Sequence, residues 1–262
     1  MTKILITGGT GVLGRALTPR LIQQGHTVRI MSRSAQPARL AEGAEWAQAH
    51  LETSAGLEAA VAGAPIIIHC ASSPMQRTRA ADINGTQRLL AAARAAGATH
   101  FIYISIVGIE RFPTYPYYKI KLEAERLIEA SGVPYTILRA TQFHDLLDRA
   151  LKAFSRFPVL FLPKDLQFQL VDAGEVAEAL AACVAAGPVG RVADVGGPEV
   201  LPSGEIIAAW LAAHGLRRLV FHLPLPFPAA EGFRRGYNTC PQNRQGTITW
   251  AGWLQKKNVG QY

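Results

Sequence analysis

The stretch that decides the fold lies at the start of the chain and reads Lys3-Ile4-Leu5-Ile6-Thr7-Gly8-Gly9-Thr10-Gly11-Val12-Leu13-Gly14-Arg15. It predicts a short apolar strand, a glycine-rich turn and the first turn of a helix. Gly8, Gly11 and Gly14 fit the spacing GxxGxxG, and Gly9 with Gly11 and Gly14 fits GxGxxG. A helix N-terminus presents free backbone N–H groups and the positive end of its dipole, which attract phosphate. Between a strand and a helix, such a turn favours a dinucleotide site over a turn that merely packs.

Composition predicts one globular domain. The chain has 262 residues, of which 49% are hydrophobic and 18% are charged. This length suits a single domain over residues 1–262, with the main nucleotide-binding part at about 1–145 and a smaller substrate lobe drawn from about 146–262. The cysteines Cys70, Cys183 and Cys240 are widely spaced, which argues against a disulfide framework and a metal site.

Charge and hydropathy bound the partners. The formal net charge is +8, but the cations are scattered rather than clustered, so no nucleic-acid partner is expected. No apolar run approaches the ~20 residues that span a bilayer, and Met1 leads into a strand without a signal-peptide layout. We therefore expect a cytoplasmic monomer or homodimer that acts on a small-molecule substrate and contacts no membrane.

Strands and helices alternate through the first half of the chain. After the first strand, predicted strands cover Thr27–Met31, Ala44–Ala49, Ile66–Cys70, His100–Ser105 and Tyr135–Arg139, and predicted helices cover Val12–Gln24, Pro37–Glu42, Leu57–Ala62, Thr78–Ala96 and Tyr117–Ala130. The alternation predicts an α/β fold, a Rossmann doubly wound parallel sheet with helices on both faces. Beyond it, short strands are predicted at 158–163, 166–171, 191–195 and 219–223, with helices over Val176–Ala186 and Gly204–Ala213.

Arg33 predicts the cofactor. It follows the second strand, where NAD sites place a carboxylate on the ribose and NADP sites place an arginine on the 2′-phosphate. No acidic residue occurs between Gly25 and Ala41. We therefore expect NADP(H), with Ser32 or Ser34 assisting Arg33. The alternative is a surface arginine without a ligand.

A second constellation predicts acid–base chemistry. Tyr117 and Lys121 are four residues apart, so they share a helix face, and a nearby ammonium lowers the pKa of a phenol. Ser105 ends the preceding strand and is placed to hydrogen-bond a carbonyl oxygen. Tyr115 and Lys119 have the same spacing, but Pro116 favours the first helical position and leaves Tyr115 outside the helix. The structural alternative is that Tyr117 packs and Lys121 is solvated.

These motifs resemble the short-chain dehydrogenase/reductase superfamily of the extended or atypical, NmrA-like type. The resemblance rests on the stretches Thr7–Gly14, His69-Cys70-Ala71-Ser72, Asp82-Ile83-Asn84-Gly85-Thr86, Leu138-Arg139-Ala140-Thr141-Gln142-Phe143 and Trp250–Leu254, together with Ser105, Tyr117 and Lys121. It implies catalysis by the last three residues. It implies cofactor contacts from Gly8, Thr10, Gly11, Val12, Leu13, Gly14, Ser32, Arg33, Ser34, Ala71, Ser72, Lys121, Ala140 and Thr141. Phe143 and His144, just past the sixth strand, are predicted to face the substrate; for His144 a packed position is the alternative.

The sequence departs from that family at two places. His50 stands where many members have an aspartate that meets adenine, and Glu175-Val176 replaces a common Asp-Val. Some atypical members sense the redox state of the cofactor without catalysis. Two functions therefore stay open: an NADPH-dependent oxidoreductase that reduces a small carbonyl or quinone-like compound, and an NADP(H)-binding regulator. An exposed apolar patch would favour the regulator.

Overall fold

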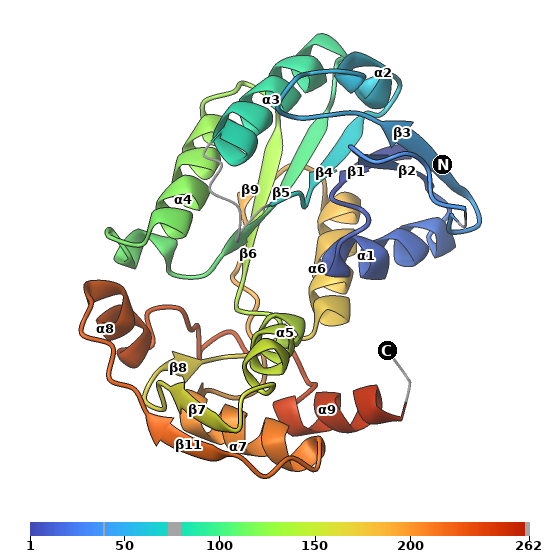
Figure 1. Cartoon of the computed structure of the whole chain (residues 1–262). Helices are drawn as coiled ribbons and strands as arrows, with labels where there is room; N and C mark the ends of the chain where they lie inside the picture. Colours follow the sequence, from blue (N-terminus) through green and yellow to red (C-terminus); the bar gives the residue numbers. More distant parts are fainter. Residues whose placement is uncertain (39, 73–79, 260–262) are drawn as a thin grey trace. The chain divides into compact units, whose positions relative to one another are not determined.

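A computed structural model describes residues 1–38, 40–72 and 80–259 of the chain (Figure 1). The chain forms two compact units. Unit 1 comprises Met1–Ser105, Pro116–Arg139 and Val176–Ala193, and unit 2 comprises Ile106–Tyr115, Ala140–Glu175 and Asp194–Tyr262. The units interleave along the chain, whereas the sequence analysis placed one boundary near residue 145, because the last strand of the unit 1 sheet and the helix before it come late in the sequence.

Unit 1 is built on a seven-stranded sheet in the order β3-β2-β1-β4-β5-β6-β9. Its strands are β1 (Lys3–Thr7), β2 (Thr27–Ser32), β3 (Ala44–Gln48), β4 (Ile66–His69), β5 (His100–Ile106), β6 (Tyr135–Ala140) and β9 (Gly190–Arg191). Strand β1 pairs in parallel with β2 on one side and with β4 on the other. The order reverses between β1 and β4, which is the switch point where doubly wound sheets bind ligands. The predicted Rossmann-type α/β fold is confirmed.

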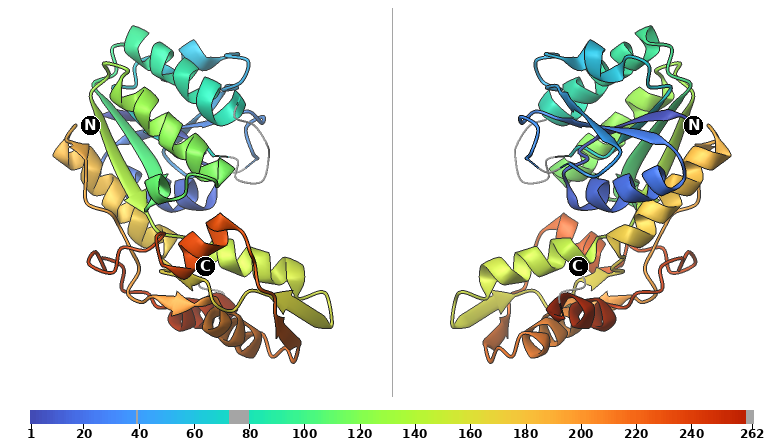
Figure 2. Two further views of the ribbon diagram at one scale, coloured as in Figure 1. Left: turned by 90° about the vertical axis from the view of Figure 1, so that its left-hand side faces the viewer. Right: turned by 90° about the vertical axis from the view of Figure 1, so that its right-hand side faces the viewer.

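Helices cover both faces of this sheet (Figures 1 and 2). One face carries α2 (Leu57–Val61), α3 (Gly85–Ala95) and α4 (Pro116–Glu129), and the other carries α1 (Val12–Gln23) and α6 (Ala173–Ala186). Leu5 of β1 lies in the core under α2, α3 and α4. Its neighbours Ile4 and Ile6 are fully buried too and point to the opposite face, because side chains alternate along a strand.

Two predicted helices of unit 1 differ in the structure. The described residues between Pro37 and Glu42 are not helical. Residues 33–38 are exposed, so no apolar face packs a helix that short. Of the helix predicted over Thr78–Ala96, its first two residues lie outside the described part of the chain, Ala80–Asn84 forms a π-helical turn, and α3 follows from Gly85.

Unit 2 has short strands and an aromatic core. Its helices are α5 (His144–Phe154), α7 (Ser203–Ala213), α8 (Pro228–Arg234) and α9 (Trp250–Asn258), and its strands are β7 (Val159–Leu162), β8 (Gln167–Phe168), β10 (Leu201–Pro202) and β11 (Leu219–His222). Strand β7 pairs with β11 in parallel, and β8 pairs with β10 antiparallel. Trp210, Trp250 and Trp253 are each 1% exposed and share one core cluster. Helices α5, α8 and α9 were not predicted. For α5 the reason is that its buried face includes the polar residues His144 and Asp148.

In the described part of the chain, none of the helices combines the length and the hydropathy needed to cross a bilayer.

Candidate functional site

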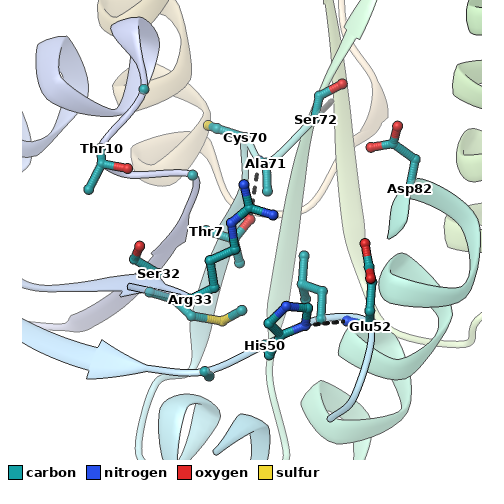
Figure 3. Close-up of a pocket in the computed structure, with 15 residues that line it drawn as sticks. Thr7, Thr10, Ser32, Arg33, His50, Glu52, Cys70, Ala71, Ser72 and Asp82 are labelled. Carbon is teal, nitrogen blue, oxygen red and sulfur yellow. Dashed lines mark hydrogen bonds between the residues drawn. The ribbon is translucent and has the colours of Figure 1, made fainter. Parts of the chain in front are cut away.

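A pocket opens at the carboxyl ends of β1 to β4 in unit 1 (Figure 3). Its lining comes from the ends of these four strands and from the start of the following helical segment: Thr7, Gly8, Thr10, Gly11, Met31, Ser32, Arg33, Ala49, His50, Leu51, Glu52, Cys70, Ala71, Ser72 and Asp82. Seven predicted cofactor residues line it: Gly8, Thr10, Gly11, Ser32, Arg33, Ala71 and Ser72. Glu52 and Asp82 were not among the predicted cofactor residues: Glu52 stands in no motif, and Asp82 was noted only as part of the Asp82–Thr86 family stretch.

The glycine turn needs glycine at two positions for reasons visible in the geometry. Gly8 has φ +71°, and a Cβ there would lie 2.7 Å from the backbone nitrogen of Ala71. A Cβ on Gly14 would lie 2.4 Å from the Cα of Gly9. Gly8 therefore lets β1 and β4 approach each other, and Gly14 lets the first turn of α1 pack on the loop that precedes it.

The N-terminus of α1 is prepared for an anion. Its cap residue is Gly11, without a side-chain cap, and its first turn contains no acidic residue. The Arg15 guanidinium donates to the carbonyl of Thr10 at 2.8 Å, which adds a cation beside the turn. Val12 is half-buried, and Leu13 and Gly14 are buried, so these three offer backbone rather than side chains. The free N–H groups and the helix dipole suit a pyrophosphate.

Arg33 lies in the pocket at the end of β2. Figure 3 shows its side chain extended over the pocket, beside Ser32. The loop is held by two bonds: Gln48 Nε2 donates to the carbonyl of Arg33 at 3.3 Å, and the Ser34 amide donates to Ser32 Oγ at 3.3 Å. This arrangement presents a guanidinium and a hydroxyl where the sequence analysis placed a 2′-phosphate.

His50 offers a donor to the pocket rather than an acceptor. The amide of Glu52 donates to His50 Nδ1 at 3.2 Å (Figure 3). A neutral imidazole that accepts at Nδ1 carries its proton on Nε2. The carboxylate that many family members place here would accept hydrogen bonds, so the polarity at this point is reversed.

A buried hydrogen-bonded chain ties the pocket floor together. Thr7 Oγ1 lies 2.6 Å from His69 Nδ1, and His69 Nε2 lies 3.0 Å from Thr86 Oγ1. The Ala71 amide donates to Thr7 Oγ1 at 3.3 Å, and Thr86 Oγ1 donates to the carbonyl of Asp82. These bonds fix every proton: Thr7 donates to Nδ1, and Nε2–H donates to Thr86. Burial and the Lys121 charge lower the pKa of His69 to about 3, so the ring stays neutral.

The three predicted catalytic residues come from the end of β5 and the start of α4. The Tyr117 hydroxyl lies 2.8 Å from Ser72 Oγ at the end of β4. Lys121 Nζ donates to the carbonyl of Ile104 at 2.8 Å, next to Ser105 in the chain. Ser105 Oγ is buried and has no hydrogen-bond partner among the described residues. The helix thus presents a phenol toward the pocket edge and an ammonium beside the end of β5.

Lys121 is a buried cation held by several neighbours. It is 3% exposed, and its Nζ lies 4.1 Å from the centroid of the Tyr103 ring. Burial lowers the pKa of Lys121 to about 8, while the charges of Asp82 and Glu125 act in the opposite direction. The side chain therefore remains mostly protonated at neutral pH and loses its charge above pH 8.

One turn beyond Lys121, a buried ion pair fixes α4 to β6. Arg139 Nε donates to Glu125 Oε1 at 2.8 Å, and Arg139 Nη2 donates to Glu125 Oε2, with both side chains under 5% exposed. The bidentate geometry sets the position of α4, and with it that of Tyr117 and Lys121.

Four predicted site residues belong to unit 2. The Thr141 amide donates to the carbonyl of Val195 at 3.0 Å, and Ala140 forms an isolated parallel bridge with the same residue. Phe143 bridges Val171. His144 is 0% exposed, and its ring centroid lies 5.6 Å from that of Trp250 and 5.4 Å from that of Trp253. This geometry favours packing for His144 over a substrate contact.

The chain is similar to proteins of known family. A family model described as NAD(P)H-binding matches residues 8–186. The (4-alkanoyl-5-oxo-2,5-dihydrofuran-3-yl)methyl phosphate reductase of Streptomyces griseus subsp. griseus is 33% identical over 208 residues, which cover 77% of this chain and 70% of the reductase. The Photosystem II assembly factor Ycf39 of Trieres chinensis is 26% identical over 183 residues, which cover 67% of this chain and 57% of that protein.

Solved structures share the fold. The NADPH complex of the quinone oxidoreductase QOR2 from Escherichia coli superposes with a TM-score of 0.78 at 20% identity, covering 97% of this chain and 99% of that chain. The NAD complex of UDP-glucose 4-epimerase from Thermus thermophilus gives 0.74 at 18% identity, covering 99% of this chain and 100% of that chain. One holds NADPH and the other NAD, so the fold accommodates both cofactors.

Proposed function

The chain belongs to the NAD(P)H-binding family, of the extended short-chain dehydrogenase/reductase type, and on that premise we propose that it is an NADPH-dependent oxidoreductase that transfers a hydride to a small carbonyl or quinone-like substrate. The observation that carries the proposal is the pairing of a dinucleotide pocket with Ser105, Tyr117 and Lys121 at neighbouring strand ends of the same unit. The reductase among its relatives supports the reaction class.

The choice of NADP(H) rests on Arg33 and Ser32. A guanidinium holds a phosphate through two parallel donors, and the serine hydroxyl adds a third. The carboxylates that line the pocket, Glu52 and Asp82, come after β3 and before α3 rather than at the end of β2. The place that an NAD site gives to an acid therefore carries a cation in this chain.

The rest of the pocket suits the remaining parts of the dinucleotide. The uncapped N-terminus of α1 binds the pyrophosphate through backbone N–H groups, with Gly8, Thr10, Gly11 and Val12 closest along the chain. His50 Nε2–H faces the base. Ala71 and Ser72 continue the lining from β4 toward Tyr117.

Ser105, Tyr117 and Lys121 each have a role in the proposed reaction. Bound NADPH would supply the hydride for the carbonyl carbon of the substrate. Tyr117 donates its proton to the carbonyl oxygen as negative charge develops there, and Ser105 Oγ hydrogen-bonds the same oxygen. Lys121 holds the nicotinamide ribose and, as a fixed cation, lowers the pKa of the Tyr117 phenol. Its bond to the Ile104 carbonyl and the ion pair one turn away keep this cation in place.

The substrate side is assigned to the segment after β6. Ala140 and Thr141 stay predicted cofactor contacts and Phe143 a predicted substrate contact, because ligands of doubly wound sheets bind beyond the carboxyl ends of the strands. A structure with bound NADPH in which Phe143 lies far from the nicotinamide contradicts this assignment.

The second candidate function is an NADP(H)-binding regulator without catalysis. Two observations favour it: unit 2 exposes several large apolar side chains, and relatives of this chain are named as assembly factors. A regulator of this kind would bind NADP(H) but would not turn over any substrate of the panel.

The test is NADPH oxidation measured across a panel of quinones, aldehydes, ketones and sugar nucleotides. We expect turnover of at least one carbonyl or quinone class, lowered in Ser105→Ala. Absence of turnover across the panel, with NADPH binding intact, transfers the assignment to the regulator.

A further inference from the structure

Unit 2 exposes an apolar ribbon that the cofactor site does not use. Six large side chains from α5, β7, β11 and their flanks are between 40% and 64% exposed: Phe154, Phe157, Phe161, Leu219, Phe221 and Leu223. We refer to these six residues as the ribbon surface. Monomeric proteins rarely expose contiguous apolar side chains in such number without a binding role.

The pairing of β7 with β11 explains why these side chains gather. The strands are parallel, with Phe161 opposite Phe221. The two rings stack with centroids 5.5 Å apart. Leu160 and Leu162, on the other face of β7, are buried in the aromatic core of unit 2. The strand pairing thus buries the side chains on one face of β7 and leaves the apolar side chain of Phe161, on the other face, exposed.

An apolar groove continues this face along the chain. It is lined by Phe154, Phe157 and residues 158–162. The groove lies between the end of α5 and β7, so the exposed rings and the groove form one non-polar region.

The two chain segments that carry the ribbon surface contain charges of one sign only. The stretches 151–164 and 216–223 contain Lys152, Arg156, Lys164, Arg217 and Arg218 and no acidic residue. Arg218 Nε donates to the carbonyl of Ser155 at 3.3 Å, which brings Arg217 and Arg218 beside Arg156. The next acid along the chain, Asp165, is bound to Arg234 at 2.6 Å.

We infer that the ribbon surface binds the surface of an anionic lipid membrane, with its phenylalanines in the headgroup boundary and the cations on lipid phosphates. Phenylalanine and leucine flanked by lysine and arginine are the composition that such interfaces select. A second copy of the chain fits the ribbon surface less well. Two ribbon surfaces in contact would bring the five cations of one copy close to the five cations of the other, and like charges repel. The proposed contact is peripheral and differs from the expectation, based on sequence, that the chain contacts no membrane.

Flotation with lipid vesicles tests the inference. Vesicles of phosphatidylglycerol and phosphatidylcholine in equal parts are expected to carry the protein upward, and vesicles of phosphatidylcholine alone are expected to carry far less. Phe161→Ser/Phe221→Ser is expected to weaken binding to the anionic vesicles at least tenfold. Val189→Ser, which alters a 56% exposed valine of unit 1, is the matched control and is expected to bind as wild type.

The charge is tested separately. Each cation near an anionic leaflet strengthens binding roughly fivefold, so Arg156→Glu is expected to weaken it by more than that, while Arg94→Glu on α3 is not. Circular dichroism and NADPH binding show that each variant is folded. Three results overturn the inference: no binding to anionic vesicles, equal binding by Phe161→Ser/Phe221→Ser, or a concentration-dependent dimer that these two substitutions abolish.

Discussion

Unit 1 and unit 2 each bury a histidine, yet they do so in different ways. His69 in unit 1 has both ring nitrogens hydrogen-bonded, to Thr7 and Thr86. His144 in unit 2 lies against Trp250 and Trp253, and neither of its ring nitrogens has a partner among the described residues. The contrast extends to the aromatic residues of unit 2, which buries three tryptophans in one cluster and exposes Phe161 and Phe221.

The difference shows what each unit provides. In unit 1, ordered hydrogen bonds hold the ends of β1, β4 and β5 in fixed positions, as a site for a phosphorylated cofactor and a proton donor requires. In unit 2, aromatic packing is combined with separate buried polar contacts, such as Trp210 Nε1 donating to Asp148 and Gln169 Nε2 donating to the carbonyl of Gly197. Substitutions in the two units test whether the chemistry belongs to unit 1 and how much unit 1 depends on its buried polar contacts.

The largest effect is expected from Tyr117→Phe, measured on the substrate that the panel yields. Loss of a positioned proton donor lowers turnover by about 100–10,000-fold, while the NADPH dissociation constant stays nearly unchanged because the phenol is not part of the cofactor pocket lining. Phe161→Ser in unit 2 serves as control and should leave turnover unchanged. Undiminished turnover in Tyr117→Phe would contradict the assignment of Tyr117 as the proton donor.

Glu125→Gln tests the ion pair beneath the catalytic helix. The substitution leaves the Arg139 guanidinium buried beside a neutral amide, which destabilises the fold by about 3–5 kcal/mol in chemical denaturation. Glu231→Gln, which breaks exposed ion pairs of unit 2, is expected to change the unfolding free energy little. Equal effects of the two substitutions would contradict the view that unit 1 depends on buried polar order.

The two histidines provide a matched pair. His69→Phe leaves the buried Thr7 and Thr86 hydroxyls without their partner and should cost about 2–4 kcal/mol. His144→Phe keeps an aromatic ring against the two tryptophans and should change stability by less than about 1.5 kcal/mol at pH 7. Thr7→Val, which breaks the same chain from the other side, should destabilise in the same direction as His69→Phe. A larger loss in His144→Phe than in His69→Phe reverses the comparison.

Acid titration tests whether His144 is buried in its neutral form. Burial lowers the pKa of His144 from 6.5 to about 3, so below pH 6.5 the unfolded chain binds a proton that the folded chain excludes. Stability therefore falls with decreasing pH by about 1.4 kcal/mol per pH unit for this group. His144→Phe removes that loss, and from pH 7 to pH 5 it should gain about 2 kcal/mol relative to wild type. Parallel pH profiles for the two proteins would show that His144 is not buried in the neutral form.

The nucleotide unit was largely predictable from sequence because its signals are local. Gly8, Gly11 and Gly14 stand close together in sequence, and the alternation of strands and helices predicts a parallel sheet with helices on both faces. Arg33 was placed by its distance from those glycines. Glu52 and the Thr7–His69–Thr86 chain were not, since hydrogen bonds between residues 62 and 17 positions apart leave no periodic signal.

Unit 2 was less predictable for physical reasons. Its strands β8 and β10 have two residues each, too few to show an alternation. Helix α5 buries His144 and Asp148, and the latter accepts hydrogen bonds from Trp210 and Lys257, so its buried face does not read as apolar. The exposed rings of β7 and β11 resemble core residues in the sequence, and the structure shows them outside.

The central claim is that unit 1 binds NADP(H) through Arg33, and the most direct measurement is the pair of dissociation constants for NADPH and NADH in wild type, Arg33→Ala and Arg15→Ala. We expect wild type to bind NADPH about 10–100-fold more tightly than NADH, since charge-assisted bonds to a phosphate contribute about 1.5–3 kcal/mol. Arg33→Ala should lose this preference by weakening NADPH alone, and Arg15→Ala should weaken both cofactors alike. Equal affinity of the wild-type protein for NADPH and NADH would contradict the claim.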